Sequence, residues 1–263
     1  MLRFARKPLG VILACASVAV LASGCGVSHY NRLVRKRAAR LRGEVKFKGL
    51  YQPTKIPDTP LSIRIPMIFS DSYTAESPHP DDGAQIRPDR LAPPFLPLPG
   101  MKLTYENTAT APDGSKQPFY CYLAAVTSQA GQAERYAGEL LTRLKQTFPN
   151  APDAWEVVDA ESPTGFAVHW QKIRTSGPQP FLVKKDGQVA VQSLDGLFEL
   201  WMHDAGDHVV FVGWRTPSAI NEPSTGELPS EGGTVLPPSD PKPDMDKWPQ
   251  LTAGTLTKES DAE

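Results

Sequence analysis

Apolar residues recur at helical spacing in one segment of the chain, residues 128–150 (SQAGQAERYAGELLTRLKQTFPN). Positions three and four apart share one face of an α-helix, so this spacing predicts an amphipathic helix with a buried stripe. Pro149 ends the pattern, because proline cannot continue a helix. The stripe consists of Ala133, Ala137, Leu140, Leu141, Leu144 and Phe148.

Apolar and polar residues follow the pattern of β-strands before this helix. Leu61, Ile63 and Ile65 alternate toward one face until Pro66, which predicts an edge strand or the end of a strand. Two longer strands are expected before the helix, at 101–109 (MKLTYENTA) and 118–126 (PFYCYLAAV).

Five apolar runs follow the helix, and turn signals such as Asp186-Gly187 and Asp195-Gly196 separate them. Consecutive strands with short turns form an antiparallel meander. We therefore predict an α+β fold in which one main helix covers an antiparallel meander sheet. The five runs are 155–160, 166–174, 181–192, 196–203 and 208–216.

The composition divides the chain into four parts. Residues 44–215 form the predicted α+β domain, which is long enough for one core and contains a proline-rich loop near 70–100. From 216 to 263 the chain is rich in Pro, Ser, Gly and acidic residues, which predicts a disordered acidic tail. A docking motif around Met245 and Trp248 is the alternative for part of this tail.

The first 24 residues have the features of an export signal. The basic stretch MLRFARK precedes an apolar run that is shorter than the roughly 20 residues of a comfortable membrane span. Small residues follow the run, which favours cleavage over permanent anchoring. Two alternatives stay open: ordinary cleavage that releases the protein, and an uncleaved anchor whose positive flank would hold the domain in the cytoplasm.

The residues Leu21-Ala22-Ser23-Gly24-Cys25 resemble the lipobox of bacterial lipoproteins, although the leucine stands one place further back than is usual in that family. The resemblance implies that Cys25 receives diacylglycerol, that cleavage occurs before it, and that the new amino group is acylated, for example by palmitate. It places the protein in the bacterial cell envelope, lipid-anchored and facing the periplasm or the exterior. Gly26 in the next position implies that transfer to an outer membrane is permitted.

Residues 25–43 carry the anchor and a basic collar. Apolar residues from Tyr30 to Leu41 recur at near-helical spacing, so we predict a surface helix. Beside a lipid anchor, its basic side chains could contact anionic headgroups, and a solvated stalk is the alternative. An exported chain would not meet nucleic acid, so that partner is not expected. The basic residues are Arg32, Arg35, Lys36, Arg37, Arg40 and Arg42.

The whole chain is close to neutral, with a formal net charge of −1, and chemistry must be sought in local clusters. The segment HDAGDH holds His203, Asp204, Asp207 and His208, which could ligate a metal or act as acid and base. The same residues suit a hairpin turn, where glycine accepts positive φ and aspartate caps the turn. Cys121 lies among apolar strand residues and is expected to be an inert core thiol.

Tryptophans give a second candidate surface. Trp170, Trp201 and Trp214 could line an aromatic groove for a sugar or peptide, and core packing is the alternative. No cofactor is expected, because the chain contains no P-loop, nucleophile elbow, zincin motif or dinucleotide fingerprint.

The order of strand 61–69, one central helix and the late hairpin 196–216 is similar to the PsbP/DcrB/Mog1-type α+β fold. Members of this group are often small envelope or accessory proteins, so the resemblance implies a binding role. We therefore expect a lipid-anchored, non-enzymatic accessory or binding module with an envelope protein partner. The alternatives are an envelope hydrolase that uses His203, Asp204 and His208, and a structural spacer without a ligand.

Overall fold

The computed structural model describes residues 30–34, 37–38, 45–74, 92–163, 165–221 and 243–258. The chain divides into two compact units: residues 1–48 with 163–165, and residues 49–162 with 166–263. In the first unit, residues 30–34 and 37–38 are helical, and Arg32 and Arg37 are exposed. The predicted signal peptide, Cys25 and the collar residues Arg35, Lys36, Arg40 and Arg42 lie outside the described residues.

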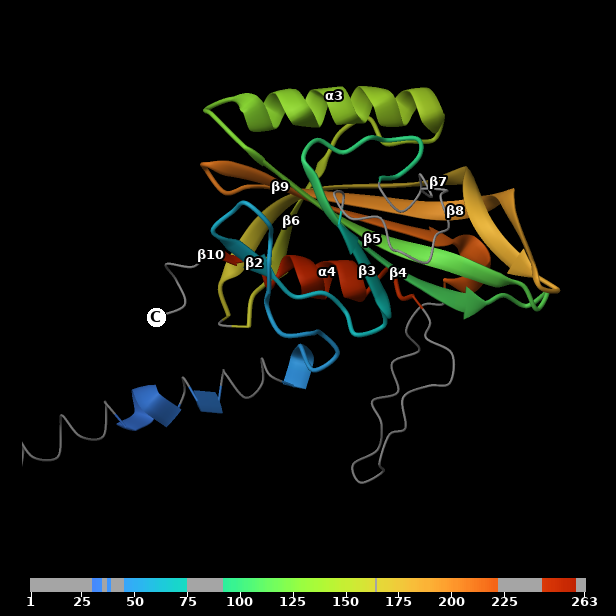
Figure 1. The fold of residues 1–263 in the computed structure, drawn as a ribbon. Coiled ribbons are helices and arrows are strands. Elements are labelled where there is room, and N and C mark those ends of the chain that lie inside the picture. The colour runs from blue at the N-terminus through green and yellow to red at the C-terminus, as the bar shows by residue number, and fades with distance from the viewer. Residues whose placement is uncertain are drawn as a thin grey trace, which may run out of the picture. The chain divides into compact units, whose positions relative to one another are not determined.

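The second unit is an α+β fold dominated by an antiparallel sheet of seven strands in the order β3-β4-β5-β9-β8-β7-β6 (Figure 1). The predicted fold class is therefore confirmed. The strands are β3 (Asp71–Thr74), β4 (Met101–Thr110), β5 (Lys116–Thr127), β6 (Glu156–Glu161), β7 (Ala167–Lys185), β8 (Gln188–Asp204) and β9 (His208–Pro217).

Helix α3 (Gln132–Thr147) covers one face of this sheet (Figure 1). Its buried residues are those of the predicted stripe, with Leu141 half-buried at the margin. They pack against Tyr122, Leu200 and Phe211, which point from β5, β8 and β9 toward the helix. Phe148 ends the helix in extended conformation, as the following proline requires.

The opposite face is covered by a smaller sheet and by the end of the chain. Strands β1 (Thr54–Lys55), β2 (Leu61–Ile63) and β10 (Thr257–Lys258) form an antiparallel sheet in the order β1-β2-β10. Helix α4 (Trp248–Ala253) precedes β10 and lies against the large sheet (Figure 1). The predicted inward residues of the first strand, Leu61, Ile63 and Ile65, are buried in this second core.

The prediction that the chain is disordered from residue 216 is wrong for residues 216–221 and 243–258. Strand β9 extends to Pro217, and the 3-10 helix η2 (Ser218–Ile220) follows it. Met245 and Leu256 are buried in the core beside the large sheet, and β10 completes the small sheet. The composition of the tail is dominated by prolines and acidic residues, so it did not indicate a short apolar segment within it. The large sheet can bury this segment. Residues 222–242 and 259–263 lie outside the described part.

The meander contains one fewer turn than predicted. Asp186-Gly187 forms a two-residue turn between β7 and β8, with φ of 50° and 78°. Asp195-Gly196, however, lies inside β8, where Gly196 pairs with Gly177 of β7. A Cβ atom on Gly196 would stand 2.9 Å from the ring of Phe181, so this glycine serves close packing and not a turn.

Beyond this glycine pair the hairpin of β7 and β8 continues past the end of β9. Strand β9 stops pairing with β8 at Gly196, whereas β7 and β8 remain paired as far as Lys185 and Gln188. Near its tip β7 also pairs with the start of β5, at Lys116. The hairpin therefore closes over the helix-facing side of the sheet at this end.

Candidate functional site

The HDAGDH segment is the turn between β8 and β9. Asp204 Oδ1 accepts a hydrogen bond from the backbone N–H of Gly206 at 2.8 Å, and Gly206 has a φ of 86°. Ala205 N–H donates to the carbonyl of His208 at 2.8 Å and closes the turn. Asp204 thus caps the turn, the alternative role that its sequence context allowed.

His203 is held by the neighbouring strand. Its Nδ1 lies 2.7 Å from the carbonyl oxygen of His169, and because a carbonyl only accepts, Nδ1 must carry the proton. The ring lies 5.2 Å from that of Trp170, and burial lowers the pKa of His203, although the bond to His169 opposes the shift. The imidazole of His203 therefore links β8 to β7.

Asp207 and His208 form a separate pair on the other side of the turn. His208 Nδ1 lies 3.3 Å from Asp207 Oδ1, and Lys258 Nζ lies 3.2 Å from Asp207 Oδ2. These two contacts lower the pKa of Asp207, with that of His208 the larger. In the described part of the chain, no three His, Cys, Asp or Glu side chains converge as metal ligands would. Asp207 and His208 therefore contact each other, whereas His203 bonds to His169 and Asp204 bonds to Gly206.

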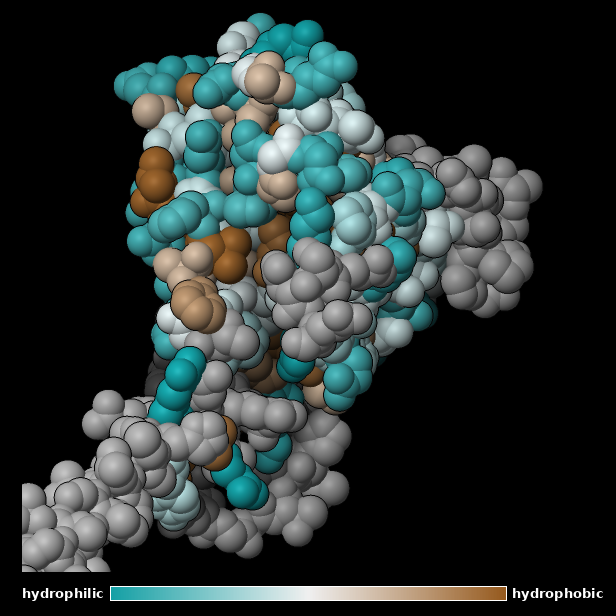
Figure 2. Space-filling view, turned by 90° about the vertical axis from the view of Figure 1, so that its left-hand side faces the viewer, coloured by the Kyte–Doolittle hydropathy of each residue, from teal (hydrophilic) through white to brown (hydrophobic). Residues whose placement is uncertain are grey.

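The surface on this side is mainly hydrophilic. Figure 2 shows the side on which β5 leads into α3, where polar side chains cover most of the described residues and apolar ones appear as separate spots. Such a surface is ordinary for a folded domain.

The three tryptophans are core residues, and the aromatic groove predicted from them is covered. Trp170, Trp201 and Trp214 are each no more than 2% exposed. Trp170 Nε1 donates to the carbonyl of Ala253 in α4 at 3.1 Å, so the end of the chain lies over this ring. The sequence pattern could not reveal this cover because the covering segment was expected to be disordered.

Cys121 is fully buried, as expected, and burial raises its pKa well above the ordinary value. A nucleophilic cysteine needs a lowered pKa, so this thiol is inert in the folded protein.

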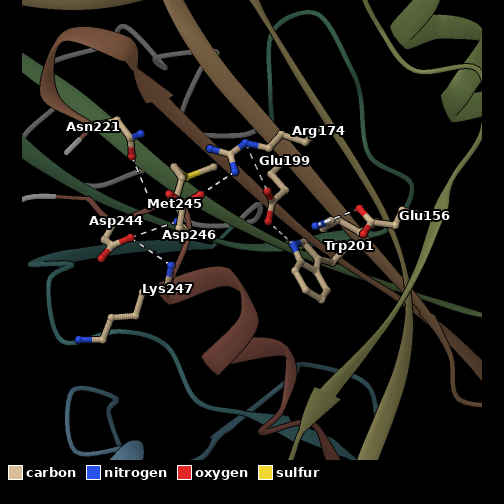
Figure 3. Close-up of polar contacts among 10 residues, drawn as sticks. Glu156, Arg174, Glu199, Trp201, Asn221, Asp244, Met245, Asp246 and Lys247 are labelled. Carbon is tan, nitrogen blue, oxygen red and sulfur yellow. Dashed lines mark hydrogen bonds and ion pairs between the residues drawn. The ribbon is translucent and has the colours of Figure 1, made fainter. Parts of the chain in front are cut away.

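A polar cluster centred on the buried side chain of Glu199 lies beside the C-terminal segment (Figure 3). Glu199 on β8 is 2% exposed, and its Oε1 accepts the indole N–H of Trp201 at 2.6 Å. Arg174 on β7 bridges two carboxylates, with its Nε 3.7 Å from Glu199 Oε2 and a terminal nitrogen 2.7 Å from Asp246 Oδ1. Burial raises the pKa of Glu199, whereas Trp201 and then Arg174 oppose the shift.

The remaining members of the cluster order the C-terminal segment itself (Figure 3). Asn221 Oδ1 accepts the N–H of Met245 at 3.2 Å, and Asp244 Oδ1 accepts the N–H groups of Asp246 and Lys247. Sequence reasoning missed this cluster because its partners come from β8, β7 and a segment much later in the chain. The one available signal was Glu199, a charged residue inside an apolar strand.

A second buried charge lies on the helix-facing side of the sheet. Arg215 on β9 has no exposed surface, and its guanidinium lies 4.1 Å from the ring centre of Phe181 and 5.4 Å from that of Tyr120. It donates to Gln179 Oε1 at 3.2 Å and to the carbonyl of Pro180. These contacts hold the bent end of the β7–β8 hairpin over the sheet.

A small pocket separates the ends of β5 and β9 from residues 243–248. Its walls include Phe69, Trp214 and Met245, and it has room for about one water molecule. The indole N–H of Trp214 is buried without a hydrogen-bond partner, so a water here would satisfy it. Such a pocket is far smaller than the sites that enclose substrates.

No helix in the described part of the chain is long and apolar enough to cross a membrane.

Comparisons with known proteins provide no family for this chain. No family model matches it, and no curated protein matches it. Among solved structures it is similar to a protein from Bacteroides thetaiotaomicron VPI-5482, with a TM-score of 0.26 and 12% sequence identity. The alignment covers 60% of this chain and 43% of that chain, so the match spans less than half of that protein. A similarity at this level carries no argument about function.

Proposed function

We propose that the chain is a lipid-anchored protein of the bacterial cell envelope, whose folded domain acts as a non-enzymatic accessory or binding module for another envelope protein. The observation that carries the proposal is the cysteine at the junction of the apolar run and the basic collar, in Leu21-Ala22-Ser23-Gly24-Cys25. Attached acyl chains would hold the domain at a membrane, because each buried methylene contributes about 0.8 kcal/mol.

The arrangement of polar side chains supports a binding role. His203 and Asp204, the candidate acid and base, are engaged in hydrogen bonds that hold the β8–β9 turn. Catalysis needs groups that converge on a space from which water is excluded. The one pocket described above has room for about one water molecule and lies against the C-terminal segment, away from this turn.

The basic collar supports contact with the membrane surface. Arg32 and Arg37 follow the proposed anchor residue in the sequence, and both are exposed on helical turns of the first unit. A basic residue close to an anionic bilayer contributes about 1 kcal/mol of attraction, so the collar would hold the chain against headgroups.

Metabolic labelling with a palmitate analogue tests the anchor. The full-length protein, Cys25→Ala and Cys15→Ala are expressed in a bacterial host, and label and membrane fraction are measured for each. We expect label in the wild type and in Cys15→Ala, which retains the thiol at the junction. Cys25→Ala should lose the label and either leave the membrane or accumulate as precursor.

Two results would contradict the proposal. If no form is labelled and all remain in the membrane, the apolar run is an uncleaved anchor. If no form is labelled and all are released after cleavage, an ordinary signal peptide precedes a free protein.

A further inference from the structure

The outer edge of the β7–β8 hairpin is an open strand edge with an unusual composition. Strand β8 pairs with β9 only from Gly196 onward, and no described residue pairs with the β9 side of residues 188–195. All residues from 188 to 193 are exposed, including Val189 at 51% and Val191 at 69%. This edge projects to the right in Figure 1.

Open edges in natural sheets are normally protected by charged residues, because unpaired N–H and C=O groups bind other strands. The opposite edge strand of the same sheet follows this rule, since β6 carries Glu156, Asp159 and Glu161. Residues 188–194 (QVAVQSL) carry no charge, and the first charged residue of the open stretch is Asp195. The edge of β8 is therefore competent to pair with another strand.

The turn geometry shows which backbone groups face outward. The two-residue turn with positive φ at Asp186 and Gly187 makes Lys185 and Gln188 a hydrogen-bonded pair. In an antiparallel ladder such pairs alternate with non-hydrogen-bonded ones. Ala190 therefore directs its N–H and C=O toward β7, whereas Val189 and Val191 direct theirs toward the open edge.

We propose that this edge is a dimerisation surface, on which β8 of a second copy of this chain pairs antiparallel about a two-fold axis at Ala190. The sequence Gln188-Val189-Ala190-Val191-Gln192 reads the same in both directions. A two-fold axis at its centre places Val189 opposite Val191 of the second copy, and these two residues exchange both backbone hydrogen bonds. This is the hydrogen-bonded position that their outward groups require.

The side chains also match in this register. Glutamine lies opposite glutamine, alanine opposite alanine, and the four valines gather on one face, so no like charges oppose each other. Strand pairing over five residues buries less than the ~800 Å² per partner of a standard stable interface. The dimer is accordingly weak, and cross-linking in cells detects it where dilution would dissociate it.

Disulfide cross-linking of the full-length chain in intact cells tests the register. Ala190 and its two-fold mate form a non-hydrogen-bonded pair, whose Cα separation of about 4.5 Å suits a disulfide. Under mild oxidation, Ala190→Cys should give a disulfide-linked homodimer that reductant dissolves. The controls are the parent chain and Val157→Cys, which puts an equally exposed cysteine on the protected edge of β6.

Two further variants keep the test independent of any one substitution. In the proposed register, residue 188 of one copy lies opposite residue 192 of the other. We therefore expect a disulfide when Gln188→Cys and Gln192→Cys are expressed together on differently tagged copies. Neither variant should cross-link when it is expressed alone. Adding Val191→Lys to Ala190→Cys should abolish the dimer, whereas Val191→Thr should preserve it.

The readout does not depend on the lipid anchor, since strand pairing brings these cysteines together in any compartment. Equal cross-linking at positions 190 and 157, or none at 190 and none in the mixed pair, would overturn the proposal. An adduct of Ala190→Cys with a different protein would show that the edge binds a foreign strand and would also overturn it.

Discussion

At the scale of single residues, the sheet buries charged side chains on both of its faces, among them Glu199 and Arg215. Glu199 faces the C-terminal segment and has Arg174 as a cationic neighbour at 3.7 Å. Arg215 faces helix α3 and is surrounded by aromatic rings, with carbonyl and amide oxygens as its acceptors. Buried charges of this kind contribute specificity more than stability, because desolvation offsets much of their attraction.

Two substitutions of Glu199 should distinguish the effect of its hydrogen bond on stability from the effect of its charge. Glu199→Gln keeps an oxygen that accepts the N–H of Trp201 and removes a carboxylate whose charged form burial disfavours. Glu199→Ala leaves that indole N–H without its acceptor and should cost about 1–3 kcal/mol of unfolding free energy. We expect Glu199→Gln to be at least as stable as the wild type at neutral pH, as measured by chemical denaturation.

The pH dependence of these variants has a defined sign. Because the pKa of Glu199 is raised, the folded state keeps its proton over a range in which the unfolded chain has lost it. The contribution of Glu199 therefore lowers the free energy of unfolding of the wild type as pH rises from the ordinary glutamate pKa to the raised pKa. The advantage of Glu199→Gln should therefore grow over that range and then level off. An advantage that shrinks with rising pH would contradict this account.

Arg215 should be replaceable by an apolar side chain of similar length. Arg215→Met keeps the contacts with Phe181 and Tyr120 without a buried charge, and we expect a change within about 1.5 kcal/mol. Arg215→Ala leaves a cavity among the rings and should cost about 2–4 kcal/mol. Thermal unfolding of the two variants compares these effects. A methionine variant that is as unstable as the alanine one would show that the guanidinium hydrogen bonds dominate.

At the scale of elements, the segment 243–258 acts as part of the core. Its contacts reach both sheets: Trp170 bonds to Ala253, the N–H of Arg64 donates to Thr255 Oγ1, and β10 pairs with β2. A chain end that completes two sheets in this way is expected to unfold together with them.

Two truncations test this role. A chain that ends at Lys242 loses the buried side chains of Met245, Leu251 and Leu256, together worth roughly 5 kcal/mol or more of burial. That is comparable with the whole net stability of a domain, so we expect loss of cooperative unfolding and binding of a hydrophobic dye. The control chain ends at Lys258 and should unfold like the wild type. If both truncated chains were equally stable, the segment would not be an essential part of the core.

The sequence predicted local elements better than the contacts between distant ones. The stripe of α3 and the strand segments that became β4, β5 and β9 are short-range signals, and the structure confirms them. The sequence did not predict that three apolar runs join into β7 and β8. Asp195-Gly196 has the composition of a turn, but Gly196 is needed because Phe181 packs against it too closely for a side chain. The covering of Trp170 by Ala253 depends on a contact across 83 positions, which no local pattern records.

At the scale of the whole molecule, the proposed function is that of an anchored binding module. Among the described residues, α3 covers one side of the sheet, the end of the chain covers the other, and the pocket beside residues 243–248 has room for about one water molecule. Among the described residues, the open edge of β8 is suited to pairing with β8 of a second copy. The proposed module would act through contacts with other proteins, and an anchor at Cys25 would set the surface on which they form.

The N-terminal peptide of the protein isolated from membranes tests this account most directly. Digestion after basic residues releases a peptide that ends at Arg32, and its mass identifies both the first residue and any attached lipid. The account predicts a peptide that begins at Cys25 and carries diacylglycerol with an acylated amino group. A peptide that begins at Lys7 or Pro8, which digestion of an uncleaved signal would leave, would contradict the central claim. So would an unlipidated peptide that begins at any other residue.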